Sequence, residues 1–217
     1  MLKISEIFCS IQGESTYSGL PCIFIRLAGC NLRCDYCDSI YSYESDVEFS
    51  VADIISKIRG YNPLKLVEIT GGEPLLQSDT IELLEQLLEA GFSVLLETSG
   101  TTGTIPLSEV PAGVSRIVDI KTPDSGIDES EIDFDEIAKL GKDDELKFVC
   151  QSREDYLWSK ALVESGRLPA EPVTVFSPVQ DDLSARKLAD WIVEDKLNVR
   201  YQIQLHKVIW PEMDRGV

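Results

Sequence analysis

GCNLRCDYCDS, residues 29–39, holds Cys30, Cys34 and Cys37 in a C-x3-C-x2-C pattern. It directly follows the apolar, β-branched run Cys22–Leu27, which predicts a buried strand. Thiolates are soft ligands that suit iron–sulfur clusters or zinc. Three thiolates in one tight loop can bind three irons of a cubane cluster. The fourth iron then stays open to another ligand, as the open position of a catalytic zinc site does.

A zinc knuckle is one alternative for this loop, and buried cysteines without a ligand are another. A zinc knuckle would need a fourth Cys or His at metal-ligand spacing. The only histidine is His206, far along the chain, and Cys150 has no second cysteine close to it. The spacing therefore favours an iron–sulfur cluster.

Short β-branched runs alternate with helical stretches along the chain. We predict strands at Cys22–Leu27, Leu66–Thr70, Ser93–Glu97, Arg116–Lys121, Glu145–Val149 and Val173–Phe176. We predict helices from Ser50 to Ile58, and at Ile81–Ala90, Asp133–Leu140, Arg153–Glu164 and Ser184–Glu194. This alternation implies a parallel sheet with right-handed crossovers. Because six units are too few for a closed eight-stranded barrel, we expect an α/β fold: an open partial (βα)6 TIM-type barrel.

Both ends of the chain add predicted strands, at Ile4–Ile11 and Val199–Val208. The acidic stretch Asp124–Asp135 is typical of a surface loop that enters a helix. No linker rich in Pro, Gly or Ser divides the chain, so we expect a single domain over residues 1–217.

The composition limits the partners. The net charge is -18, from 38 acidic against 20 basic residues, which argues against nucleic acid because backbone binding needs a basic surface. No apolar run approaches the ~20 residues of a membrane span. The first residues show no basic region followed by an apolar stretch, so we expect a cytoplasmic protein without a membrane partner.

Three further motifs end the next three predicted strands: Thr70–Pro74 (TGGEP), Glu97–Gly100 (ETSG) and Asp119–Pro123 (DIKTP). Parallel sheets bind ligands at the carboxyl ends of their strands. The cysteine loop also follows a strand, so we expect all four segments to surround one site.

The cysteine loop resembles that of the radical S-adenosylmethionine (SAM) superfamily, and Thr70–Pro74 resembles its GGEP motif. The resemblance implies a 4Fe–4S cluster on Cys30, Cys34 and Cys37, with SAM chelating the open iron. Reduction of the cluster would cleave SAM to a 5′-deoxyadenosyl radical that takes hydrogen from the substrate. The resemblance implies SAM contacts at Tyr36, Asp38, Gly72, Glu97 and Ser99, and less strongly at Lys121 and Ser177.

Residues 6–15 and 19–34 closely resemble the 7-carboxy-7-deazaguanine synthase family. The similarity continues through Glu145–Phe148 and His206–Pro211 and covers nearly the whole chain. It implies a carbon–nitrogen lyase that converts 6-carboxy-5,6,7,8-tetrahydropterin into 7-carboxy-7-deazaguanine with loss of ammonia, on the route to deazapurines such as queuosine.

The residue types suit a pterin substrate. The backbone of Ile11, Gln12 and Gly13 and the Gln12 and Glu14 side chains can match the donors and acceptors along one pterin edge. Arg26, a charge inside an apolar run, can grip the substrate carboxylate in bidentate fashion. The resemblance adds Thr70 as a substrate contact. His206 is expected either to line the substrate pocket or to pack structurally, and the sequence leaves both open.

The resemblance also implies Mg²⁺, an electron donor and a homodimer. Family members usually have threonine, whose hydroxyl binds Mg²⁺, at the position of Ser39; the serine keeps the hydroxyl. The donor would be a protein such as a flavodoxin. Exposed apolar residues near Trp210 could serve a dimer.

Two rival functions remain at this stage. An activase that installs a glycyl radical on a partner protein would share the cysteine loop, but it has no need for Gln12–Glu14 or Arg26. A non-catalytic iron–sulfur electron carrier would normally supply four cysteines and would not need Thr70–Pro74.

Overall fold

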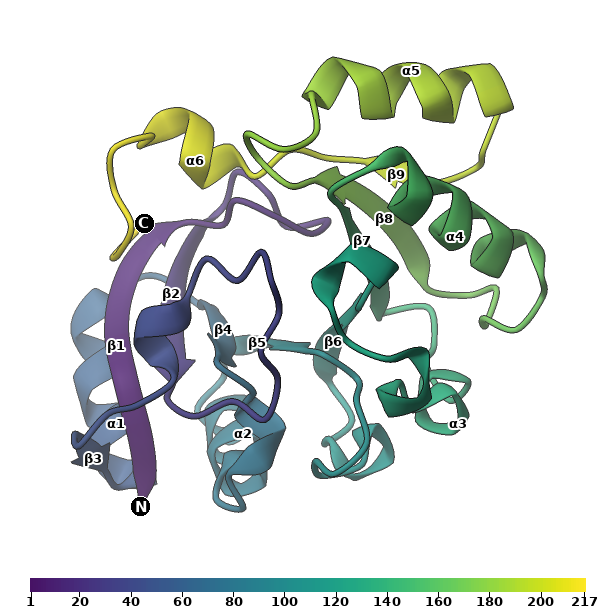
Figure 1. The fold of residues 1–217 in the computed structure, drawn as a ribbon. Coiled ribbons are helices and arrows are strands. Elements are labelled where there is room, and N and C mark those ends of the chain that lie inside the picture. Colours follow the sequence, from purple (N-terminus) through teal and green to yellow (C-terminus); the bar gives the residue numbers. More distant parts are fainter.

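Nine strands form one sheet in the order β3-β1-β2-β4-β5-β6-β7-β8-β9 in the computed structural model, which describes residues 1–217 (Figure 1). From β2 to β9 neighbouring strands are parallel, whereas β1 is antiparallel to β2 and β3 is antiparallel to β1. The outermost strands, β3 and β9, do not pair with each other, so the sheet stays open. The predicted open α/β partial barrel is confirmed.

The strands are β1 (Leu2–Ile11), β2 (Pro21–Leu27), β3 (Glu48–Phe49), β4 (Leu66–Gly71), β5 (Ser93–Thr98), β6 (Val114–Ile120), β7 (Glu145–Cys150), β8 (Val173–Pro178) and β9 (Arg200–Tyr201). The helices are α1 (Val51–Ile58), α2 (Thr80–Glu89), α3 (Phe134–Ile137), α4 (Arg153–Glu164), α5 (Ala185–Asp195) and α6 (Leu205–Ile209). The six core strands and the long helices therefore lie where the sequence predicts them.

Local signals explain where the helices begin and end. The Ser50 side chain caps α1 by accepting a hydrogen bond from the Asp53 N–H, and Ser152 caps α4 in the same way. After α2, Gly91 adopts φ 79°, a left-handed conformation that favours glycine and stops the helix.

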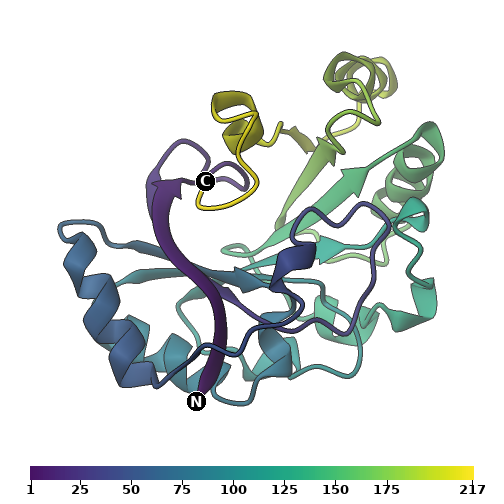
Figure 2. The same ribbon diagram turned by 60° about the vertical axis from the view of Figure 1, so that its left-hand side comes forward.

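The strands alternate between two environments because successive side chains point to opposite faces of a sheet. On β4, Val67 and Ile69 pack into the main apolar core, and the residues between and after them do not. Figures 1 and 2 show helices on the convex side of the sheet, where they cover this core. The segment between β2 and β3, which carries the cysteine loop, lies across the concave side (Figure 2). The concave side is therefore free to form a site.

The predicted C-terminal strand Val199–Val208 is wrong over most of its length. Only Arg200–Tyr201 pairs with β8, and Leu205–Ile209 forms helix α6. The Leu205 N–H donates to the Gly13 carbonyl at 2.9 Å, and the Gln204 side chain donates to Glu14. The chain leaves the sheet because these contacts draw it over the loop that follows β1.

Two smaller predictions also need correction. The helix expected at Asp133–Leu140 is a single turn, Phe134–Ile137. The acidic stretch Asp124–Asp135 is more ordered than a plain loop: it contains a 3-10 turn at Glu129–Glu131, and Ile132 pairs with Thr101 in an isolated bridge.

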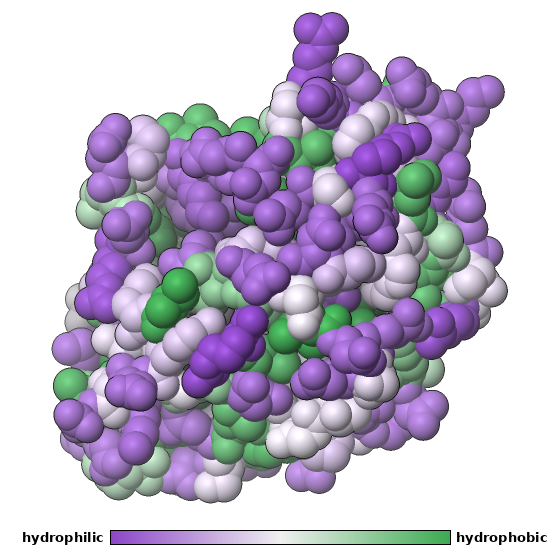
Figure 3. Space-filling model, viewed as in Figure 1, coloured by the Kyte–Doolittle hydropathy of each residue, from purple (hydrophilic) through white to green (hydrophobic).

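The surface agrees with the acidic composition. Hydrophilic residues cover most of the face seen in Figure 3, with apolar residues scattered among them. None of the helices has the length and apolarity needed to cross a membrane.

Candidate active site

One pocket brings together almost all the residues that the sequence predicts for a site. It is lined by Ile11, Gln12, Gly13, Glu14, Arg26, Cys30, Cys34, Tyr36, Cys37, Asp38, Ser39, Thr70, Gly72, Glu97, Ser99, Lys121 and His206. Ser177 is the exception: it is fully buried on β8 and does not line the pocket. Its hydroxyl has no hydrogen-bond partner.

The cysteine loop forms one wall of the pocket. Its shape is held by the backbone: the Cys37 N–H donates to the Cys34 carbonyl at 3.2 Å, and the Asp35 N–H donates to the Ser125 carbonyl at 3.0 Å. All three thiols are half-buried and free of disulfides. Burial raises the pKa of the Cys30 and Cys34 thiols, so a metal centre must displace their protons when it binds.

The three thiols fit an iron–sulfur cluster better than a single ion. No group of three His, Cys, Asp or Glu side chains converges on one point that could hold a metal ion. A cubane cluster does not require such convergence, because each thiolate binds a different iron. All three thiols face the same pocket, and the donor set is all thiol.

The TGGEP segment packs directly against the residue that precedes the cysteine loop, Gly29. A Cβ at Gly72 would lie 2.1 Å from the Gly29 carbonyl oxygen and 2.9 Å from the Cys30 Cβ. The Glu73 N–H donates to that same Gly29 carbonyl at 2.8 Å. The resemblance implies a SAM contact at Gly72. The structure adds that this glycine lets the segment after β4 pack directly against the cysteine loop.

Glu73 ties this segment to the end of β5. Its carboxylate accepts hydrogen bonds from the Thr98 hydroxyl at 2.8 Å and from the Ser99 N–H and hydroxyl at 2.8 and 2.7 Å. Only 1% of Glu73 is exposed. Ser99 lines the pocket, but its hydroxyl is already engaged by Glu73 and Thr101.

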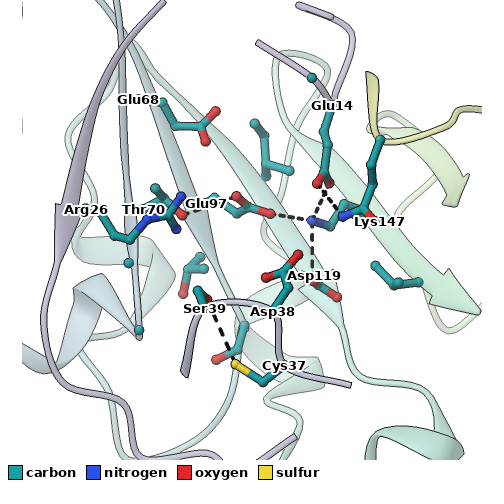
Figure 4. A pocket seen from close by; sticks show the side chains of 18 of the residues that line it. Glu14, Arg26, Cys37, Asp38, Ser39, Glu68, Thr70, Glu97, Asp119 and Lys147 are labelled. Atoms are coloured by element: carbon teal, nitrogen blue, oxygen red, sulfur yellow. Dashed lines mark hydrogen bonds and ion pairs between the residues drawn. The ribbon is translucent and has the colours of Figure 1, made fainter. Parts of the chain in front are cut away.

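Charged side chains from the strands form the opposite wall (Figure 4). Lys147 on β7 places its Nζ 2.8 Å from Glu14 Oε2, and it also donates to Glu97. Burial alone would raise the pKa of Glu14, but Lys147 and His206 outweigh it and lower that pKa to about 2. Glu14 is therefore ionised at neutral pH.

A second ion pair lies next to the cysteine loop. Lys121 Nζ is 3.1 Å from Asp119 Oδ2. Burial lowers the pKa of Lys121, but Asp119, Tyr36 and Cys34 together raise it above its ordinary value. The Tyr36 hydroxyl and Asp119 Oδ1 are buried without a hydrogen-bond partner, so both remain available to a bound molecule.

Glu68 lies deep in the pocket and accepts a hydrogen bond from the Gln12 amide. Only 3% of Glu68 is exposed. Burial, together with Glu97 and Glu14, raises its pKa well above the ordinary value. The Gln12 Oε1 in turn accepts from the Glu14 N–H at 3.0 Å, which fixes the loop after β1.

Arg26 and His206 lie at the edges of the pocket. Arg26 Nε donates to Glu6 Oε1 at 2.9 Å, and the guanidinium lies over the Tyr41 ring. His206 lines the pocket and also packs against Gly13, where an added Cβ would come within 2.2 Å of its Nδ1. The position of His206 is thus compatible with both alternatives, and a role in substrate binding stays a prediction.

Sequence reasoning missed Glu68 and Lys147 as site residues, and it placed Asp119 near the site only as the first residue of the DIKTP motif. Each is a charge inside an apolar strand run, which is the signal that pointed to Arg26. The alternation of β7 shows why: Leu146 and Phe148 pack into the main core, while Lys147 between them faces the pocket. The same alternation, applied to the predicted strands Leu66–Thr70 and Arg116–Lys121, points to Glu68 and Asp119.

The fold and the site define the class of protein. The family model of the Radical SAM superfamily matches residues 24–145, more than half of the chain. Membership of this superfamily implies a four-iron cluster and SAM. The zinc and electron-carrier interpretations are thereby set aside.

Full-length relatives narrow the class. The 7-carboxy-7-deazaguanine synthase of Chlorobaculum tepidum is 42% identical over all of this chain and 97% of its own. The synthase of Koribacter versatilis is 40% identical over the whole length of both chains. The crystal structure of QueE from Escherichia coli has the same fold, with a TM-score of 0.76 over 94% of each chain at 24% identity. The chain belongs to the 7-carboxy-7-deazaguanine synthase family.

Proposed function

We propose that this chain converts 6-carboxy-5,6,7,8-tetrahydropterin into 7-carboxy-7-deazaguanine with loss of ammonia. One observation carries the proposal: a single pocket has three free thiols on one wall and the predicted pterin-binding residues Gln12, Glu14 and Arg26 on the other. Identity to the curated synthases over the full length supports the same reaction.

The cofactors fit the cysteine wall. Cys30, Cys34 and Cys37 would hold the cluster, which together with SAM supplies the radical that starts the reaction. Tyr36, Gly72 and other residues around the loop would bind SAM: Asp38, Glu97, Ser99 and Lys121. Ser177 is the least favoured of the SAM contacts that the resemblance implies, because it does not line the pocket.

The other wall would orient the substrate. Ionised Glu14 accepts hydrogen bonds from N–H groups, and the Gln12 amide both donates and accepts. Thr70 is hydrogen-bonded to Glu97 at 3.2 Å and would contact the substrate. Arg26 would bind the carboxylate through its terminal nitrogens, because only its Nε is engaged by Glu6.

The proposal also includes Mg²⁺, an electron donor and a homodimer. The Ser39 hydroxyl would bind Mg²⁺; its one contact is a long one, 3.9 Å from the Cys37 sulfur. A protein such as a flavodoxin would reduce the cluster. Residues 1–217 would act as one radical SAM domain, and exposed Val208 and Ile209 on α6 would contribute to a homodimer.

The test is an anaerobic assay. The protein is reconstituted with iron and sulfide and then given SAM, Mg²⁺, a strong reductant and 6-carboxy-5,6,7,8-tetrahydropterin. Mass spectrometry should detect 7-carboxy-7-deazaguanine that depends on both the cluster and SAM. SAM cleavage without this product would refute the proposed substrate and favour the activase alternative, whose protein partner would then be sought by pulldown.

A further inference from the structure

We propose that Lys147 is a positioning residue that holds the Glu14 carboxylate in the orientation in which it meets the substrate. This inference rests on the proposed function, because it assigns the Glu14 carboxylate to a pterin. It extends that function by giving a role to a buried lysine that lies outside the motifs at the strand ends but contacts Glu97 of the ETSG motif and Asp119 of the DIKTP motif.

Lys147 joins three elements that are distant in the sequence (Figure 4). Its Nζ contacts Glu14 from the loop after β1 at 2.8 Å, Glu97 from β5, and Asp119 from β6 at 3.4 Å. No other cation contacts all three carboxylates. The lysine side chain is 5% exposed, so solvent does little to weaken these pairs.

Both Glu14 and Glu97 are held at both carboxylate oxygens. Glu14 accepts a hydrogen bond from Lys147 at Oε2 and another from the Gln204 amide at Oε1, at 2.8 Å in each case. Glu97 accepts from Lys147 at Oε1 and from the Thr70 hydroxyl at Oε2. Lys147 therefore fixes where the remaining lone pairs point, which matters because preorganised acceptors orient a ligand without rearrangement.

The surrounding charges explain why an ammonium is needed. Glu68 on β4 also faces this group, while Lys121, directly after β6, pairs with Asp119, and His206 on α6 approaches Glu14. Without Lys147, several carboxylates would share a buried space with little compensating charge. Such groups take up protons, and a protonated carboxyl donates where the substrate needs an acceptor.

The experiment compares three variants with the wild type. Lys147→Met removes the charge while keeping the stem, and Lys147→Arg keeps the charge. The control is Lys160→Met, which removes another ion-paired lysine: Lys160 Nζ lies 3.1 Å from Asp195, on the outer helix α4. For each protein one measures iron content, SAM cleavage without substrate, and the KM for 6-carboxy-5,6,7,8-tetrahydropterin.

Lys147→Met should raise KM by at least about 30-fold, as expected when one partner of a buried charge group is removed. Iron content should remain near wild type, and so should SAM cleavage, because Glu97 keeps its hydrogen bond from Thr70. Lys147→Arg should recover most of the lost affinity, and Lys160→Met should match the wild type. If Lys147→Met fails to retain iron, Lys147→Gln is measured in its place with the same expectation.

An unchanged KM in the charge-free variant overturns the proposal, and so does a KM for Lys147→Arg no better than that of Lys147→Met. Parallel losses of SAM cleavage and pterin affinity would indicate a general structural role and also overturn it. If the wild type makes product, these failures concern Lys147 alone. If the wild type makes none, the proposed function fails, and this inference fails with it.

Discussion

The two walls of the pocket are built on different principles. The cysteine wall is one continuous loop, residues 30–39, whose shape comes from backbone hydrogen bonds such as Cys37 N–H to Cys34. Its thiols have almost no partners within the protein. The strand wall gathers side chains from β2, β4, β5, β6 and β7 and from the loop after β1, and most of them are paired with one another.

The difference indicates a division of labour. A loop held by its backbone leaves its side chains free for a group that the protein does not itself supply. A wall of paired charges is rigid before anything binds, and it can therefore orient a polar substrate without rearrangement. Changes to the loop cysteines should remove the cofactor, whereas changes to the substrate residues Glu14 and Arg26 should weaken substrate binding and spare the cofactor.

The largest effect is expected on the cysteine wall. Cys34→Ala should abolish product formation, because two thiolates cannot replace three as cluster ligands. Iron and sulfide analysis after reconstitution, with the visible absorption spectrum, measures the loss. Cys9→Ala is the matched control, since Cys9 is an exposed free cysteine on β1 outside the pocket. A full iron and sulfide complement in Cys34→Ala would refute the ligand assignment.

The next effect is expected on the strand wall. Arg26→Ala should raise the KM for the pterin by about 30-fold, because a charged partner of the carboxylate is lost. SAM cleavage should persist. Arg186→Ala on α5 changes an arginine whose side chain is 89% exposed, and it should behave as wild type. Unaltered substrate affinity in Arg26→Ala would remove the proposed role of that residue.

Two carboxylates of the strand wall should affect stability with opposite signs. The pKa of Glu14 is lowered from 4.5 to about 2, so Glu14 stabilises the fold above pH 4.5. That contribution, about 3 kcal/mol at full value, is lost as the pH falls toward 2. The pKa of Glu68 is raised, so its contribution is complete below pH 4.5 and declines as the pH rises.

Urea unfolding at several pH values measures both effects. At pH 8, Glu14→Gln should lower the free energy of unfolding, and Glu68→Gln should raise it. The two variants serve as controls for each other, because both replace a pocket glutamate by its neutral isostere. If both variants shift the free energy of unfolding in the same direction, the two carboxylates do not contribute to stability with opposite signs.

The smallest effect is expected for Ser39. Ser39→Ala should raise the Mg²⁺ concentration needed for half-maximal activity by about tenfold, and Ser39→Thr should keep it unchanged, because threonine retains the hydroxyl. A titration of activity against Mg²⁺ measures this. Equal requirements in wild type and Ser39→Ala would place the magnesium site elsewhere.

What could be predicted from the sequence follows the same division. The cysteine wall is contiguous, so its spacing and the preceding strand were sufficient to predict it. The open sheet was predictable as well, because each β-branched run and each helix cap acts locally: α4 begins and ends where the sequence predicts, with Ser152 as its cap.

The strand wall was predicted only in part. Its ion pairs join residues up to 133 positions apart, as between Glu14 and Lys147. No local sequence feature shows which strands will become neighbours. The helix α6 was mistaken for a strand for a related reason. Its contacts are with the loop at Gly13, and such long-range contacts decide the fate of a short segment.

The most direct test follows SAM consumption and 7-carboxy-7-deazaguanine formation in the same anaerobic sample, for the wild type, Cys34→Ala and Arg26→Ala. The wild type should show both activities, Cys34→Ala should show neither, and Arg26→Ala should consume SAM while forming little product at limiting pterin. A wild type that consumes SAM but never forms 7-carboxy-7-deazaguanine would contradict the proposed function. Loss of SAM consumption in Arg26→Ala would contradict the separation of the two walls.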